Sequence, residues 1–207
     1  MNRHRLFHSK TSPYARKVLV FAIETNQASD LELIETDVWI SNPEHVGANP
    51  LGKVPTLVTP QGQVIFDSLV ICEYLDRRHS FDSLLPLSGK ERWEILTRHA
   101  LAQGIMDASL TRRWEYKFRP AEQQSEYWMQ RQQAAITRAM SQFDAGELPR
   151  LDRFGIDGAA LACALSYIDM RCDLLRLDHA WRAAFPKLAE WHRTATQRVS
   201  MQQTEAG

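Results

Sequence analysis

Hydrophobic residues in the first 80 positions follow strand and helix periods in turn. Short apolar runs over 4–9, 31–36, 56–59 and 64–66 have the length of strands. The last two flank Pro60-Gln61-Gly62-Gln63, which indicates a turn between paired strands. Residues 13–26 and 68–79 have the spacing of helices, and residues 42–48 indicate a short helical turn. The predicted order of elements is therefore β-α-β-(short α)-β-β-α.

The pattern changes after residue 80. Residues 81–89 include Pro86 and Gly89 and are predicted to link a first domain, 1–80, to a second, 90–207. Only helical runs follow, over 90–119, 121–145, 156–177 and 186–199, and residues beyond Ser200 are expected to fray. The run over 156–177 is apolar on most sides, which is typical of a central buried helix. The sequence thus predicts a small α/β domain followed by an all-α domain.

Charge and cysteine content argue against several classes of protein. The 207 residues include 25 Lys and Arg against 25 Asp and Glu, so no global field attracts nucleic acid or an anionic membrane. No apolar run approaches the roughly 20 residues of a transmembrane helix, and the N-terminus lacks the apolar core of a signal peptide. Cys72, Cys163 and Cys172 form no C-x-x-C pair, which favours buried thiols in a reducing cytoplasm over disulfides or a zinc site. His4 and His8 share a strand face, but two histidines without a third ligand make a poor metal site, so no metal is expected.

A predicted helix begins just after the first strand. Ser12-Pro13 places a preferred N-cap residue before a proline at the first helical position, so a structural cap is one interpretation. The free N–H groups and positive dipole end of such a helix also favour an anion, and a thiolate there has a lowered pKa. The Ser12 hydroxyl would add one directed hydrogen bond to that thiolate, with Ser9 and Thr11 as nearby alternatives. Ser12 and Ala15 stand where a Cys-Pro-Tyr-Cys dithiol would have its cysteines, so this segment cannot form a redox disulfide.

A second motif, NPLGKVPTLV over 49–58, combines a tight loop with a proline before a strand. If the Val54–Pro55 peptide bond is cis, the backbone N–H and C=O of Val54 are left unpaired. An exposed backbone edge of this kind pairs with an extended peptide by strand addition. A plain loop before an edge strand is the alternative interpretation.

A third motif, FDSLVICEYL over 66–75, places Asp67-Ser68 where a strand is followed by a helix. Ser68 is predicted to be the N-cap, and its hydroxyl with the first helical N–H groups suits a carboxylate. Asp67 suits an ammonium group, so the two residues match the zwitterionic end of an amino acid. A capped helix with a solvated Asp67 is the alternative.

The three motifs together predict one peptide-like ligand. Such a ligand has a thiol over Ser12, an extended backbone against Val54 and an α-amino-acid end at Asp67-Ser68. Glutathione has these three parts.

The same residues carry a resemblance to a known family. The chain resembles cytosolic glutathione S-transferases over essentially its whole length, the bacterial serine-type members most, and it is similar to the plant tau class. NPLGKVPTLV followed by FDSLVICEYLDRR is a specific pair of motifs. The segments GIMDASLTRRWEYKFRP (104–120) and ALACALSYIDMR (160–171) look like the fourth and sixth helices of the family. The resemblance implies a thioredoxin-like N-terminal domain, an all-α C-terminal domain and a homodimer.

The resemblance also implies a role for each motif residue. Ser12 matches the thiol-activating serine, Val54 the residue that binds the cysteinyl backbone, and Pro55 the cis-proline. Asp67-Ser68 matches the γ-glutamyl site, and Lys53 is expected to reach the glycine carboxylate of glutathione.

The expected activity is transfer of glutathione, a co-substrate rather than a cofactor, to a small, hydrophobic electrophile whose identity the sequence leaves open. Tyr14, Met106 and Trp114 are candidate wall residues of the second-substrate cleft, with core packing as the alternative for Met106. The competing hypothesis is a non-catalytic glutathione-binding or regulatory protein that retains the fold. A thiol reductase is disfavoured, because that reaction uses a protein cysteine where this chain has Ser12.

Overall fold

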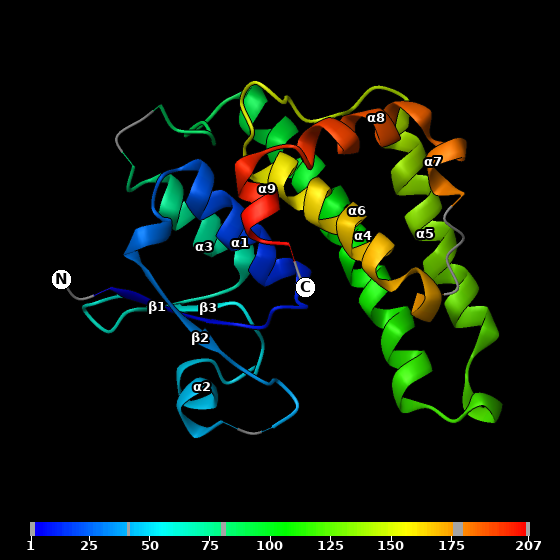
Figure 1. The fold of residues 1–207 in the computed structure, drawn as a ribbon, viewed down its shortest axis with the longest axis horizontal. Coiled ribbons are helices and arrows are strands. Elements are labelled where there is room, and N and C mark those ends of the chain that lie inside the picture. The colour runs from blue at the N-terminus through cyan, green and yellow to red at the C-terminus, as the bar shows by residue number, and fades with distance from the viewer. Residues whose placement is uncertain (1–2, 41, 80–81, 176–179, 206–207) are drawn as a thin grey trace.

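The computed structural model describes residues 3–40, 42–79, 82–175 and 180–205. Its four strands form one mixed sheet in the order β2-β1-β3-β4. β1 (His4–His8) pairs in parallel with β2 (Leu31–Glu35) and antiparallel with β3 (Thr56–Val58), which pairs antiparallel with β4 (Val64–Ile65). The sheet occupies one side of the molecule and the long helices the other, as Figure 1 shows.

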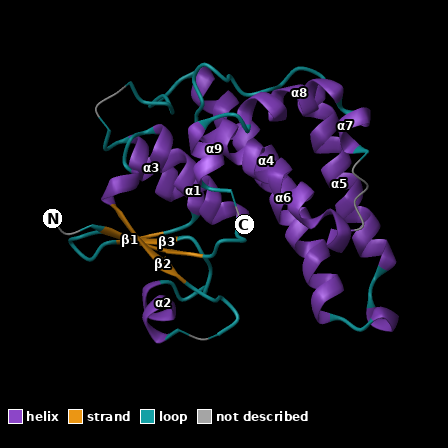
Figure 2. Ribbon diagram, viewed as in Figure 1, coloured by secondary structure: helices purple, strands orange, loops and turns teal. Residues whose placement is uncertain are grey.

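Helices cover both faces of this sheet (Figure 2). α1 (Pro13–Glu24) and α3 (Ser68–Asp76) lie on one side, and α2 (Pro43–Ala48) lies on the other. This mixed sheet between helices is the thioredoxin-like arrangement, which confirms the predicted fold of the first part. The predicted boundaries differ from the observed ones by three residues at most. α1, for example, ends at Glu24 because Asn26 adopts a φ of 56°, a left-handed conformation that stops a helix.

The rest of the described chain is helical, which confirms the second part of the predicted fold. α4 (Lys90–Phe118) packs against both α5 (Glu126–Asp144) and α6 (Ile156–Leu175). α7 (Trp181–Ala184), α8 (Pro186–Ala195) and α9 (Val199–Gln203) follow. Every side chain over 156–165 is buried, so α6 is the central helix that its composition predicts. Residue 177, the predicted end of that helix, lies outside the described residues.

Two predicted helices are divided in the structure. The run over 121–145 consists of a 3-10 turn (Ala121–Gln123) followed by α5, because the Ser125 hydroxyl accepts a hydrogen bond from Trp128 N at 3.3 Å and caps a new helix. The run over 186–199 is divided into α8 and the start of α9.

The expected fraying beyond Ser200 is wrong. α9 packs against α1, and Met201 is 1% exposed. Glu24 at the end of α1 accepts hydrogen bonds from Arg198 Nε at 2.8 Å and from the Ser200 hydroxyl. Buried apolar area and a charged hydrogen bond therefore fix a segment whose polar sequence suggested a loose end.

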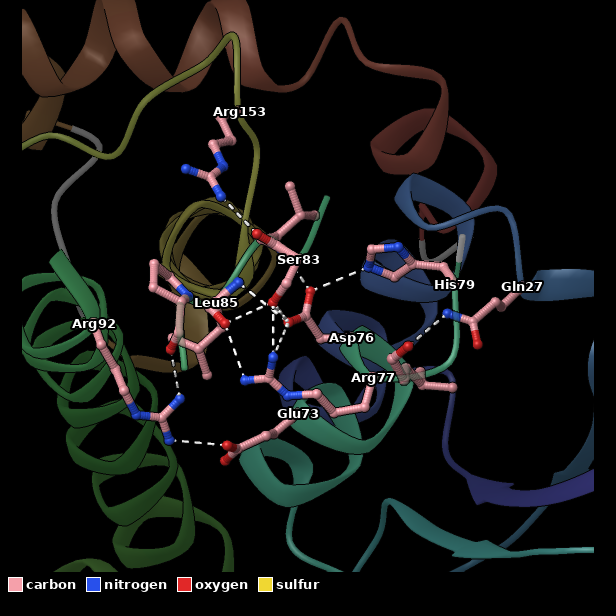
Figure 3. Close-up of polar contacts among 12 residues, drawn as sticks. Gln27, Glu73, Asp76, Arg77, His79, Ser83, Leu85, Arg92 and Arg153 are labelled. Atoms are coloured by element: carbon pink, nitrogen blue, oxygen red, sulfur yellow. Dashed lines mark hydrogen bonds and ion pairs between the residues drawn. The ribbon is translucent and has the colours of Figure 1, made fainter. Parts of the chain in front are cut away.

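A buried carboxylate at the end of α3 holds the linker between the two parts (Figure 3). Asp76 is 2% exposed, and its oxygens accept hydrogen bonds from the Leu84 N–H (2.8 Å), the Leu85 N–H (3.2 Å), the His79 ring (3.2 Å) and the Ser83 hydroxyl. Arg92 of α4 also connects the two parts, because it donates to Glu73 Oε1 (2.8 Å) on α3 and to the Pro86 carbonyl (3.0 Å) in the linker. Figure 3 shows these groups converging on the segment that joins α3 to α4.

Within the four described ranges, none of the helices combines the length and the apolar character that crossing a membrane requires. The same ranges contain no cluster of three or more His, Cys, Asp or Glu side chains arranged to hold a metal ion. The ring of His4 instead lies 3.1 Å from the Tyr74 hydroxyl.

Candidate functional site

The three sequence motifs meet at one edge of the sheet. β1 ends just before the loop that contains Ser12. Because β3 is antiparallel to β1, the start of β3, which follows Val54–Pro55, lies beside the end of β1. Because β4 is antiparallel to β3, the end of β4, which precedes Asp67, lies at the same edge. The strand pairing therefore gathers the three motifs into one site.

Ser12 is the N-cap of α1. Its backbone is extended, and its oxygen accepts a hydrogen bond from Ala15 N at 3.2 Å, while Pro13 occupies the first helical position. Its own N–H donates to the Ser9 carbonyl at 3.0 Å, and its side chain is partly exposed. The cap interpretation of Ser12 is thus confirmed, and the hydroxyl keeps access to the space above the helix N-terminus.

The Val54–Pro55 peptide bond is cis, as the family resemblance implies. Neither the N–H nor the C=O of Val54 has a hydrogen-bond partner in the part of the chain that the structure describes. The preceding carbonyl, of Lys53, accepts from His45 Nε2 (3.1 Å) and Asn49 Nδ2 (3.0 Å), while the Lys53 side chain is exposed. His45 and Asn49 hold the loop and were missed in the sequence, where nothing distinguishes them from surface residues.

The start of α3 differs from its prediction. Asp67, not Ser68, is the N-cap, because its carboxylate accepts a hydrogen bond from Leu69 N at 3.0 Å. Ser68 is the first helical residue and is 1% exposed. Asp67 is exposed, so its carboxylate remains open to an ammonium group while the first N–H groups of the helix remain open to a carboxylate.

Tyr14 connects the start of α1 to α4. The Tyr14 hydroxyl donates a hydrogen bond to Asp107 Oδ1, and burial together with this carboxylate raises the pKa of Tyr14. Met106 is fully buried and belongs to the core of the helical part, so its assignment as a cleft wall is wrong. The next residue on α4, Asp107, contacts Tyr14 instead, because adjacent helical residues point about 100° apart.

Trp114 lies two helical turns beyond Asp107 on the same side of α4 and is 40% exposed. Its indole packs edge-on against Trp39, with ring centroids 6.4 Å apart, and Trp39 also contacts Phe118 at 4.6 Å. Trp39 belongs to the loop after β2, so this aromatic cluster joins the two parts of the protein. Trp39 was not predicted as a site residue, although an apolar stretch within a loop is a sequence signal that could have identified it.

α1 presents two buried cations to the helices around it. Arg16 is 9% exposed and donates to the Met201 carbonyl at 3.0 Å. Lys17 is fully buried, and its Nζ lies 2.8 Å from His99 Nε2. Burial lowers the pKa of Lys17 and, with the Lys17 charge, that of His99 to about 3, so the imidazole is uncharged at neutral pH.

Known proteins resemble this chain both in its first part and over nearly its whole length. Residues 11–78 match the model of the glutathione S-transferase N-terminal domain. The uncharacterized GST-like protein YibF of Escherichia coli is 33% identical over 205 residues, which cover 97% of this chain and 98% of that protein.

Solved structures of glutathione transferase family members also match this chain. A glutathione transferase family member from Pseudomonas fluorescens Pf-5 with bound glutathione is 39% identical, with a TM-score of 0.90 and coverage of 99% of both chains. A structure with bound S-(propanoic acid)-glutathione, from the same species, is 40% identical, with a TM-score of 0.88 over 99% of this chain and 100% of that chain. The comparisons of sequence and of fold agree, and the chain belongs to the glutathione S-transferase family.

Proposed function

We propose that the chain is a serine-type glutathione transferase that binds glutathione, stabilises its thiolate and promotes attack of the sulfur on a small electrophile. The hydrogen bonding of the Ser12 hydroxyl supports this proposal. Its oxygen accepts the Ala15 N–H, while its own O–H has no acceptor among the residues that the structure describes. A hydroxyl can accept and donate at once, so the proton of Ser12 is available to an anion.

Two effects favour the thiolate in this arrangement. The dipole of α1 attracts negative charge, and the Ser12 hydroxyl adds a charge-assisted hydrogen bond. Such a bond is worth about 1.5–3 kcal/mol, which lowers a thiol pKa by about one to two units. The nucleophile is the sulfur of glutathione, so Ser12 needs no neighbouring base.

The rest of the tripeptide has matching groups at the same edge. The unpaired backbone of Val54 suits the cysteinyl backbone, and Asp67 with the first N–H groups of α3 suits the γ-glutamyl end. The exposed Lys53 suits the glycine carboxylate. No further cofactor enters this proposal.

A relative indicates the class of electrophile. The Pseudomonas fluorescens protein that is 40% identical holds S-(propanoic acid)-glutathione, a thioether whose sulfur substituent ends in a carboxyl group. We extend this to the present chain and propose a small electrophile with a carboxyl group, such as a 3-halopropanoic acid, as the second substrate.

The test compares Ser12→Ala and Ser12→Gly with the wild type. Both variants lose the hydroxyl, but glycine is the better N-cap, so the pair separates lost chemistry from a lost cap. We expect both to raise the pKa of bound glutathione, read from thiolate absorbance, and to lower conjugation about tenfold or more. Ser9→Ala and Thr11→Ala serve as matched controls. Unchanged thiolate absorbance and turnover in both Ser12 variants would remove Ser12 from this role, and a loss in a control variant would transfer the role to that residue.

The competing function has a separate signature. A non-catalytic binding protein would be retained on immobilised glutathione and yet conjugate no member of a panel of electrophiles.

We further propose that the protein acts as a cytoplasmic homodimer. Its three cysteines are free, as a reducing compartment favours. Apolar side chains on β4, α3 and α4 are exposed and suit a second copy: Val64 (37%), Val70 (49%) and Trp93 (65%). Light scattering during gel filtration should give the mass of two chains, and a single-chain mass would contradict the dimer.

A further inference from the structure

Ser12 borders a narrow crevice against α6, which is too tight to hold a water molecule in the free protein. Its lining includes Thr11, Arg16, Tyr167 and Met170. Arg16 and Met170 also line a cavity of about 540 Å³ between α6, α8 and α9. Arg16 therefore stands between the position of the thiol and a volume large enough for a small organic molecule.

Arg16 is a buried cation without a counterion. Its guanidinium has five N–H groups, of which one donates to the Met201 carbonyl at 3.0 Å and one to Thr204 Oγ1 at 3.4 Å. Both acceptors are neutral, and no carboxylate among the described residues lies within ion-pair distance of Arg16. At 9% exposure, water compensates this charge only in part, so an anionic ligand would stabilise it.

Tyr167 supplies a second, independent sign of a missing ligand. The residue is 1% exposed, and its hydroxyl is buried without a hydrogen-bond partner in the described part of the protein. Buried hydroxyls are normally bonded, and an unbonded one costs about 1–3 kcal/mol. Once these side chains move apart to admit it, a carboxylate in the crevice would accept from both this hydroxyl and Arg16.

The other charges nearby already have partners. In the cavity, Arg182 donates twice to Asp169, at 2.8 and 2.6 Å, and the Ser166 hydroxyl lies 3.1 Å from His192 Nε2. At the mouth of the crevice, Lys10 is exposed and pairs with Glu35 at 3.1 Å. Among the described residues that line the crevice and the cavity, Arg16 is the buried cation that has no ion-pair partner.

We propose that Arg16 and Tyr167 bind the carboxylate of the second substrate and so select acidic electrophiles. The inference rests on the proposed transferase function, and it names the two residues that determine its substrate class. Arg16 lies one helical turn after Ser12 on the same face of α1, which matches the short spacer between sulfur and carboxyl group in a propanoic acid thioether.

The reaction with 3-bromopropanoate illustrates the role. The sulfur lone pair of the glutathione thiolate forms a bond to the brominated carbon while the carbon–bromine bond breaks, and bromide leaves with the electron pair. The carboxylate remains ionised beside Arg16 throughout. The thiol proton has already passed to solvent when the thiolate forms.

Direct binding tests the inference without requiring turnover. Calorimetry compares S-(2-carboxyethyl)glutathione with its carboxamide analogue, which has the same shape without the charge. We expect the wild type to bind the acid at least about tenfold more tightly and Arg16→Gln to lose that preference, since a charged hydrogen bond is worth about that factor. Equal affinities of the wild type for acid and amide would overturn the inference, even if glutathione transfer to other electrophiles is observed.

Kinetics separates recognition from a structural role in holding α9. We expect Arg16→Gln to lower kcat/KM for 3-bromopropanoate at least about tenfold and to leave kcat/KM for 3-bromopropanamide within about twofold. Tyr167→Phe should lower only the value for the acid, while its Tm is unchanged or higher, because the lost hydroxyl has no partner in the free protein. Lys10→Gln is the matched control and should behave like the wild type.

Three results would contradict the proposal. A parallel loss for acid and amide in Arg16→Gln would assign the residue to structure alone. A lower Tm in Tyr167→Phe would mean that its hydroxyl has a structural partner. Loss of the acid preference in Lys10→Gln would mean that the exposed Lys10, rather than Arg16, binds the carboxylate.

Discussion

Replacing Asp76 by asparagine should destabilise the junction between α3 and α4 strongly. One carboxylate oxygen accepts from Leu84 N and the His79 ring, and the other accepts from Leu85 N and the Ser83 hydroxyl. An amide nitrogen cannot accept, so either the Leu84 N–H or the Leu85 N–H loses its acceptor whichever way the new side chain turns, and the remaining bonds lose the charge that strengthens them. Each buried hydrogen bond to a charged group is worth about 1.5–3 kcal/mol, so the free energy of unfolding should fall by at least about 3 kcal/mol. For a chain of this length, the Tm should fall by roughly 6–12 °C.

Thermal unfolding followed by circular dichroism measures this effect, and Glu73→Gln is the control. Glu73 also joins α3 to α4, through Arg92 at 2.8 Å, but its side chain is 38% exposed and the pair should contribute less than about 1 kcal/mol. Glutathione affinity of folded Asp76→Asn should be unchanged, because Asp76 lies at the opposite end of α3 from Asp67. A Tm for Asp76→Asn as close to the wild type as that of Glu73→Gln would refute the reasoning.

Three further predictions concern pH, thiols and the last helix. The pKa of His99 is about 3 in the folded protein against about 6.5 unfolded, so the unfolded chain binds the extra proton and stability is lost as pH falls from about 6.5 toward 3. His99→Gln should therefore make the free energy of unfolding less dependent on pH in this range, by the equivalent of up to one bound proton. Urea titrations at several pH values measure this dependence, and an unchanged dependence would contradict a neutral buried ring. Burial raises the pKa of Cys72 to about 12 and of Cys163 to about 11, so a thiol reagent should modify only the partly exposed Cys172 before denaturation, and rapid reaction of a second thiol would refute this. Met201→Ala should cost about 2–5 kcal/mol in chemical denaturation while the exposed Gln203→Ala costs nearly nothing, and equal small costs would show that α9 adds little stability.

Hydrophobic periodicity was enough to predict the order of elements, because both the sheet and α6 are buried by apolar side chains spaced at the matching period. It failed where polar groups decide the boundary. Ser125 interrupts one predicted helix by capping the next, and Glu24 holds α9 through Arg198 and Ser200 across 174 and 176 residues of sequence. Such distant partners leave no trace in a local pattern.

The candidate site was predictable to the extent that it is built from local signals. Ser12 with Pro13 and Val54 with Pro55 are adjacent pairs, and the structure has the predicted cap at the first and the cis bond at the second. The N-cap of α3 is Asp67 and not the predicted Ser68, and the sequence could not decide between them because both residue types suit that position. Arg16 could not be identified, because a charged residue in a helix ordinarily faces solvent and its burial depends on a segment 185 residues later.

The return of α9 to α1 has a consequence for synthesis on the ribosome. The strands and α1 are complete within the first 80 residues, but the outer surface of α1 is covered by α6 and α9, which begin at Ile156 and Val199. At about 5–20 residues per second, the nascent chain waits on the order of ten seconds between the end of α1 and the arrival of α6. During that interval Arg16 and Val20 lack the helices that bury them, so the emerging first domain is the form of this protein that chaperones would encounter with an uncovered side.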